Sequence, residues 1–119
     1  PALDMQGNTF ADPMVLDARA EAWSGDYGVR LAWLGAPGSE VPAIAYLREG
    51  EFNGDLLTTQ VCFKQAANPQ ASSWLAHEVI YVGAWNCIQM EMIAINGQPQ
   101  LAWSDTTTNQ VMFANRVGN

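Results

Sequence analysis

The stretch Val41-Pro42-Ala43-Ile44-Ala45-Tyr46-Leu47 decides the fold, because it returns as Gln98-Pro99-Gln100-Leu101-Ala102-Trp103-Ser104. In both stretches a proline is followed by an aliphatic residue two positions later, and then by alanine and an aromatic residue. Side chains that alternate in this way are typical of a β-strand with one buried face. The two prolines are 57 residues apart (99 − 42), and similarity at a fixed spacing indicates an internal repeat.

Outside these stretches, short apolar runs alternate with turns rich in Gly, Pro, Asn, Asp and Ser, a pattern that predicts strands. Eight strands are predicted, at residues 14–23, 28–35, 41–49, 55–64, 74–83, 88–95, 98–105 and 110–117. The composition of the first run also suits a helix, but its alternation favours a strand. Helical signals are otherwise nearly lacking, so we expect an all-β protein.

Each proline stretch stands third in a set of four predicted strands, so each repeat holds four. We expect a single domain over residues 1–119, with one repeat at about 13–65 and the other at about 72–117. A length of 119 residues suits one domain with its own core. Two alternatives remain: a single sandwich of nine or ten strands with a coincidental echo, or two and a half blades of a larger propeller.

A four-stranded antiparallel unit repeated in tandem is the blade of a β-propeller. The second repeat resembles the Asp-box-like blades of sialidase-type propellers, through Trp74, Gly97, Pro99, Leu101, Ala102, Trp103 and Asp105. The first repeat carries the resemblance through Pro42, Ile44, Ala45, Tyr46, Gly54 and Asp55. The Asp-box itself is half present: Ser24, Asp26 and Gly28 fit, but Leu31 stands where an aromatic residue belongs.

Two blades cannot close a ring, because each blade buries its faces against neighbouring blades. We therefore expect oligomerisation to close the propeller, as a homotrimer with six blades. This layout is similar to that of the small fucose-binding lectins of bacteria and fungi, which have two blades per chain and three chains. Their paired Arg and Glu ligands are not found at equivalent places in both repeats, so the resemblance concerns architecture alone.

Charge narrows the choice of partners. The chain has five Lys and Arg against twelve Asp and Glu, a net charge of −7, and its basic residues are scattered singly. Nucleic acids and anionic membranes are bound through clustered basic residues, so neither is expected as a partner. No apolar run has the length of a membrane helix, and residues 1–8 lack the features of a signal peptide. Secretion and a cytoplasmic location both remain open.

Catalytic groupings are not evident. His77 is the one histidine, and it lies among apolar residues, where a packed imidazole is more common than a general base. One histidine and two distant cysteines do not supply a zinc site, and no cofactor motif is found. Cys62 and Cys87 are expected as free thiols rather than as a disulfide. We expect no enzyme activity, with glycoside hydrolysis as the alternative.

The chain has five tryptophans in 119 residues, more than a chain of this length usually has, and they suggest a binding function. Most of them suit packing between blades, but Trp23 and Trp85 adjoin polar turns, where an aromatic ring can stack on a sugar. We predict one glycan site at Trp23, Asp26 and Arg30, and another at Trp85, Asn86 and Glu91; Glu40 and Gln89 are further polar candidates. The expected function is a multivalent carbohydrate-binding lectin. The alternatives are a structural self-assembling subunit and a fragment of a glycosidase-like propeller.

Overall fold

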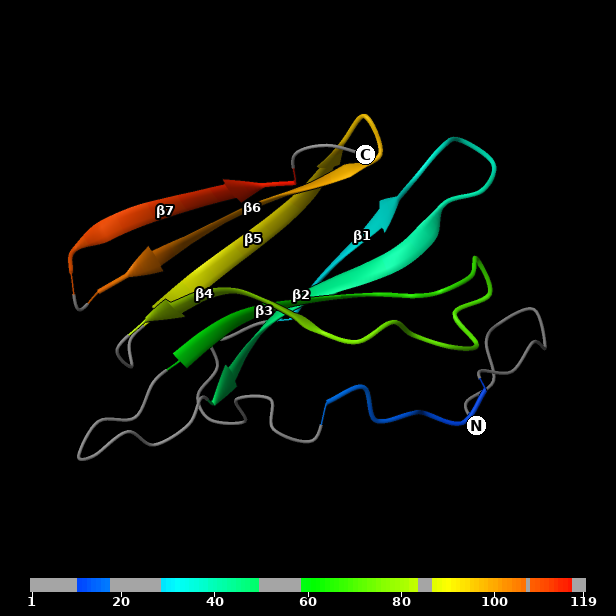
Figure 1. The fold of residues 1–119 in the computed structure, drawn as a ribbon, viewed down its shortest axis with the longest axis horizontal. Coiled ribbons are helices and arrows are strands. Elements are labelled where there is room, and N and C mark those ends of the chain that lie inside the picture. The colour runs from blue at the N-terminus through cyan, green and yellow to red at the C-terminus, as the bar shows by residue number, and fades with distance from the viewer. Residues whose placement is uncertain (1–10, 18–28, 50–58, 84–86, 107, 117–119) are drawn as a thin grey trace, which may run out of the picture.

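A computed structural model describes residues 11–17, 29–49, 59–83, 87–106 and 108–116, and these contain strands and no helix (Figure 1). The strands in chain order are β1 (Arg30–Leu34), β2 (Val41–Glu49), β3 (Thr59–Gln65), β4 (Glu78–Gly83), β5 (Cys87–Ile95), β6 (Gln98–Asp105) and β7 (Gln110–Asn115). They form a four-stranded sheet in the order β1-β2-β3-β4 and a three-stranded sheet in the order β5-β6-β7. All neighbouring strands are antiparallel. The expected all-β class is confirmed.

The alternation along β6 explains how the sheets face each other. Pro99, Leu101, Trp103 and Asp105 are buried, whereas the residues between them are half-buried. A strand places successive side chains on opposite faces of its sheet, so one face of β6 meets the first sheet. Strand β2 likewise has one buried face, which is formed by Ala43, Ala45 and Leu47.

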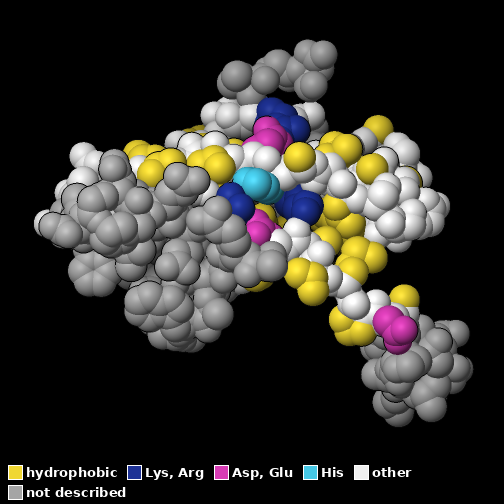
Figure 2. Space-filling model, turned by 60° about the horizontal axis from the view of Figure 1, so that its bottom comes forward, with side chains coloured by type: hydrophobic (Ala, Val, Ile, Leu, Met, Phe, Trp, Pro, Cys, Tyr) yellow, Lys and Arg dark blue, Asp and Glu magenta, His cyan; other side chains and the backbone are white. Residues whose placement is uncertain are grey.

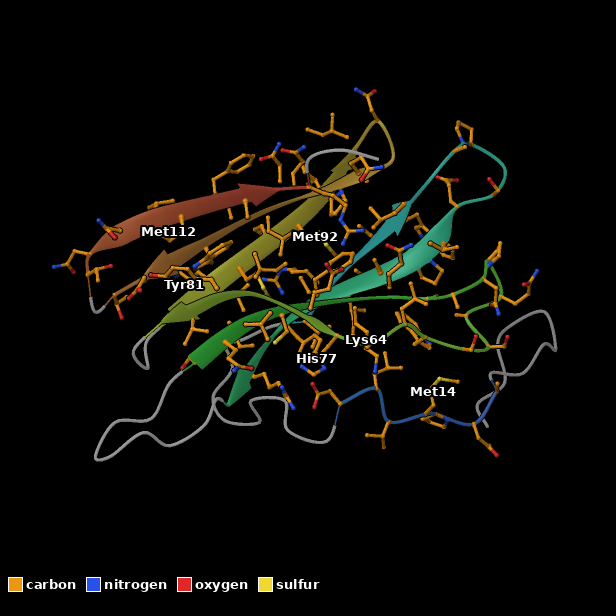
Figure 3. The ribbon with its side chains drawn as sticks, viewed as in Figure 1. Met14, Lys64, His77, Tyr81, Met92 and Met112 are labelled. Atoms are coloured by element: carbon orange, nitrogen blue, oxygen red, sulfur yellow. The ribbon has the colours of Figure 1, made fainter. Side chains whose placement is uncertain are left out.

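The core lies between the two sheets. Its buried residues come from both, Leu34, Ala43, Ala45, Leu47, Val61 and Phe63 from the first and Met90, Met92, Leu101 and Trp103 from the second. Figure 3 shows Met92 on the side of β5 that is turned to the first sheet. Burial of these side chains is the main favourable contribution to folding.

Strand β4 connects the sheets through Tyr81 (Figure 3). The Tyr81 ring lies against Trp103 of β6, with 5.3 Å between ring centroids and 50° between ring planes. Its hydroxyl donates a 2.8 Å hydrogen bond to Asp105 Oδ2, a carboxylate that is 1% exposed. A buried carboxylate requires such partners, because an unpaired one is costly to desolvate.

Seven of the eight predicted strands are confirmed over the residues that the structure describes: β4 begins at Glu78 rather than at residue 74, and residues 55–58 of the fourth predicted strand lie outside the described ones. The run predicted at residues 14–23 differs, since residues 14–17 form no strand and residues 18–23 lie outside the described ones. The grouping of strands also differs from the repeat, because residues 78–83 pair with β3 and not with β5. Similarity along the chain identifies which segments recur, but it does not identify the sheet edge that each segment joins.

Two hairpin turns, one from each sheet, meet at Gly35 and Gly97. Asn96 and Gly97 have φ angles of 53° and 77°, as expected where an Asn-Gly turn joins two antiparallel strands. The Gly35 N–H donates a 2.9 Å hydrogen bond to the Gly97 carbonyl oxygen. A Cβ atom on residue 97 would lie 2.7 Å from the Gly35 carbonyl oxygen, so the approach of the two turns requires glycine there.

Candidate functional site

A cavity of about 510 Å³ opens beside this contact between the turns. Its wall includes Trp33 from β1, Glu40 from the β1–β2 connection, Asn96 from the β5–β6 turn, and Gln98 from the start of β6. Antiparallel pairing brings the ends of each hairpin together, and the bond between Gly35 and Gly97 holds the two hairpins side by side. Residues about 60 positions apart in the chain therefore share one wall.

The side chains in this wall are accessible and chemically varied. Trp33 is 52% exposed, although tryptophan more often buries its large apolar surface. Glu40 and Asn96 are exposed and Gln98 is half-buried. A carboxylate accepts hydrogen bonds, and each amide both donates and accepts. The cavity therefore combines an apolar aromatic surface with a set of polar groups that can bind hydroxyls.

A smaller cavity, of about 340 Å³, borders the same two glycines. It shares Ala36 and Gln98 with the larger cavity but is also lined by Ser39, Gln65 and Arg116. Arg116 has other partners: it donates a 2.5 Å hydrogen bond to Glu78 Oε2, and its guanidinium lies 4.9 Å from the centroid of the Phe63 ring. These contacts hold Arg116 against the sheets.

A cluster of charged and polar side chains lies on the outer face of the first sheet. Figure 2 shows basic side chains on both sides of the histidine, and Figure 3 shows that Lys64 and His77 lie on the side of the sheet that faces residues 11–17. The Arg48 Nη1 lies 2.8 Å from His77 Nε2, and its Nε lies 3.2 Å from Asp17 Oδ2. Because an arginine only donates, the Nε2 atom of His77 accepts in this contact.

Asp17 also accepts a 2.7 Å hydrogen bond from the Tyr46 hydroxyl, and Lys64 Nζ donates a 2.6 Å bond to the Leu16 carbonyl oxygen. Burial raises the pKa of Tyr46, and the Asp17 carboxylate raises it further. Burial likewise raises the pKa of the Cys62 thiol, to about 11, against the opposing effect of Arg48. These groups satisfy one another, so the cluster fastens residues 11–17 to the sheet.

Only two of the six predicted glycan-site residues are described, and they pair with each other. Arg30 Nε of β1 lies 3.1 Å from Glu91 Oε1 of β5, although the repeat assigned the two residues to different sites. Trp23, Asp26, Trp85 and Asn86 lie outside the described residues, so both predicted sites stay predictions. Gln89 has a φ angle of 56° at the irregularity in the β5–β6 register.

Sequence reasoning named Glu40 as a polar candidate but missed Trp33, Asn96 and Gln98. The sequence does carry a signal for Asn96, because Asn96-Gly97 is a turn dipeptide between the predicted strands at residues 88–95 and 98–105. Nothing in the local pattern indicated that this turn meets the one after β1.

Among the residues that the structure describes, no three His, Cys, Asp or Glu side chains are grouped so that they could hold a metal ion. Cys62 is a buried free thiol. A search of the described residues for a helix long and apolar enough to cross a membrane found none.

The chain was compared with protein-family models, curated proteins and solved structures, and none of them matches it.

Proposed function

We propose that this protein binds carbohydrate without turning it over, at the cavity between the β1–β2 and β5–β6 turns. The observation that carries the proposal is the half-exposed indole of Trp33 in the wall of an open cavity that also has Glu40, Asn96 and Gln98. A sugar has an apolar face of C–H groups and an edge of hydroxyls, and this wall offers a partner to each.

The chemistry of the wall favours an uncharged sugar. Glu40 carries the one formal charge among the described residues that line this cavity, and a carboxylate repels an anionic sugar. Its two oxygens can accept bonds from neighbouring hydroxyls, and charge-assisted hydrogen bonds of this kind are the stronger ones. The cavity volume of about 510 Å³ is within the range of about 300–1,000 Å³ of small-molecule sites.

The proposed active form is a closed homo-oligomer, with a six-bladed homotrimer as the expected state. The outer face of the second sheet supports association, since Ile93, Ile95, Val111 and Phe113 are between 47% and 83% exposed there. These side chains lie in two pairs, one on each side of β6, and exposed apolar surface of this kind commonly marks a protein interface. Several equal sites in one ring would give avidity for clustered glycans.

The test is a glycan array, followed by titration of the sugars it identifies, with tryptophan fluorescence as the readout. Trp33→Ala is expected to weaken binding about tenfold or more, the loss of a stacked aromatic ring and its buried area. Leu31→Ala is the matched control, because Leu31 is on the same strand, is 62% exposed and does not line the cavity.

Unchanged affinity in Trp33→Ala would place the ligand elsewhere. Hydrolysis of a bound glycan would favour the glycosidase alternative. If no glycan on the array is bound and the oligomer is stable, the structural-subunit alternative is favoured.

A further inference from the structure

An arginine follows β7 on the side of the strand that faces the first sheet. Met112 and Ala114 are partly buried and pack against the core, whereas the β7 residues on either side of each are exposed. The Arg116 N–H lies 3.4 Å from the Pro99 carbonyl oxygen, which continues the pairing with β6, so Arg116 has the same inward orientation as Ala114. Its guanidinium lies 4.9 Å from the centroid of the Phe63 ring. A charged group therefore stands where the alternation of β7 predicts an apolar side chain.

An apolar cavity of about 220 Å³ borders this arginine. The apolar part of its wall comes from both sheets and consists of Phe63, Ile80, Pro99, Leu101 and Ala114. Phe63 and Leu101 are 1% and 3% exposed, so the cavity extends to the core. The cavity of about 340 Å³ beside the two glycines is also lined by Pro99 and Arg116, and the two cavities therefore adjoin at these residues.

The cavity of about 340 Å³ has the chemistry to hold a negative group. Its polar side chains are Ser39, Gln65, Gln98 and Arg116. Arg116 carries the one formal charge among the described residues that line it. Hydroxyl and amide groups donate hydrogen bonds, and the planar guanidinium matches the geometry of a carboxylate. A polar cavity with a positive charge thus adjoins an apolar cavity at one arginine.

We propose that these two cavities form one binding site for a small carboxylate with an apolar body, of the class of a medium-chain fatty acid. The carboxylate binds Arg116 from the polar cavity, and the hydrocarbon occupies the apolar one. Neither Trp33 nor Glu40 lines either cavity, and Arg116 does not line the cavity of the sugar site. The proposal therefore goes beyond sugar binding and does not rest on it.

Glu78 is the group that competes with such a ligand. Arg116 Nη2 donates a 2.5 Å hydrogen bond to Glu78 Oε2, and the two side chains are 31% and 53% exposed. Ion pairs as accessible as this one contribute little to stability, so a ligand carboxylate can replace Glu78 at low cost. Removal of the Glu78 charge is expected to strengthen binding of the ligand.

The experiment is titration calorimetry of the full chain with octanoate, and with octan-1-ol as an uncharged probe of equal length. Octanoate is expected to bind, and hexanoate and butanoate to bind more weakly by about fourfold for each CH₂ group removed. Octan-1-ol is expected to bind about tenfold more weakly than octanoate or less, because it cannot form the charge-assisted bonds to Arg116. Equal affinities for octanoate and octan-1-ol overturn the proposal, as does the absence of octanoate binding at millimolar concentration.

Two variants of the ion pair are expected to change octanoate affinity in opposite directions. Arg116→Gln weakens binding about tenfold or more, whereas Glu78→Gln strengthens it. Both variants lose the same ion pair, so a merely structural role of that pair would change the affinity in one direction.

Arg30→Gln is the matched control, since Arg30 is 35% exposed, pairs with Glu91 and lines neither cavity. Weaker octanoate binding in Glu78→Gln overturns the proposal, and so do equal losses in Arg116→Gln and Arg30→Gln. Sugar titrations on the same proteins report separately on the Trp33 cavity, because none of the three residues lines it.

Discussion

The backbone N–H of Gly35 lies 2.9 Å from the carbonyl oxygen of Gly97, and this hydrogen bond joins the two sheets at their turns. The glycines are 62 residues apart (97 − 35) and belong to different hairpins. Two cavities border this contact, and one has the half-exposed Trp33 in its wall. The geometry of the proposed sugar site therefore depends on how closely these two backbones approach.

Gly97→Ala is expected to destabilise the fold more than Gly38→Ala does. Both glycines have a positive φ, 77° and 88°, so both substitutions cost about 1 kcal/mol in backbone conformation. A Cβ on residue 97 would also meet the Gly35 backbone at 2.7 Å, whereas a Cβ on residue 38 meets nothing within 4 Å. The clash adds about 1–3 kcal/mol. Urea unfolding measures the difference, and equal costs would contradict this close approach.

Seven of the eight predicted strands are confirmed, because alternation and turn residues are local properties of the sequence. Trp103 and Leu101 follow the period of a strand, and Asn96-Gly97 marks a turn whatever the rest of the chain does. Contacts between segments that are distant in the chain have no such local sequence pattern. The partner of β4, the pair Arg30–Glu91 and the cavity around Trp33 all depend on how the sheets pack.

Asp17→Ala is expected to cost more stability than Tyr46→Phe. Asp17 and Arg48 form an ion pair whose side chains are 11% and 15% exposed, and the Tyr46 hydroxyl donates to the same carboxylate. Removing the hydroxyl costs about 1 kcal/mol. Removing the carboxylate takes a partner from both the Tyr46 hydroxyl and the largely buried Arg48 guanidinium. The expected loss in the free energy of unfolding is about 3–5 kcal/mol. A double-mutant cycle in urea measures both values, and a cheaper Asp17→Ala would show that residues 11–17 are not fastened through this pair.

Stability is expected to fall as the pH rises from about 9 to about 11. The folded Cys62 thiol has a pKa of about 11, raised by burial from an ordinary value of 9.0. Between these values the unfolded chain loses the proton and the folded chain keeps it, so unfolding becomes more favourable, by up to about 3 kcal/mol. The raised pKa of Tyr46 acts in the same direction from about pH 10 upward, because the tyrosine of the unfolded chain begins to lose its proton there.

Thiol alkylation in a Cys87→Ala background, in which Cys62 is the one remaining cysteine, measures this pKa. Folded protein is expected to react slowly at neutral pH, and protein unfolded in urea is the reference. In Cys62→Ala the fall in stability between pH 9 and 11 should be smaller. Fast alkylation of the folded chain at pH 7 would show that this thiol is neither buried nor shifted.

Glu91→Gln is expected to leave sugar binding at the Trp33 cavity unchanged. Arg30 and Glu91 pair across β1 and β5, and Arg30 precedes Trp33 by three residues along the strand. Because side chains three positions apart on a strand point to opposite faces of the sheet, a sugar stacked on Trp33 does not contact this pair.

The pair is solvent-accessible, at 35% and 71% exposure, so its loss costs at most about 1 kcal/mol of stability and the variant stays folded. Arg116→Gln, which breaks the comparably exposed pair with Glu78, is the matched control for a lost surface charge, because Arg116 does not line the Trp33 cavity. Titrations of both variants with the same sugar measure the affinity. A lower affinity in Glu91→Gln than in Arg116→Gln would contradict this prediction and show that the ligand also depends on the Arg30–Glu91 pair.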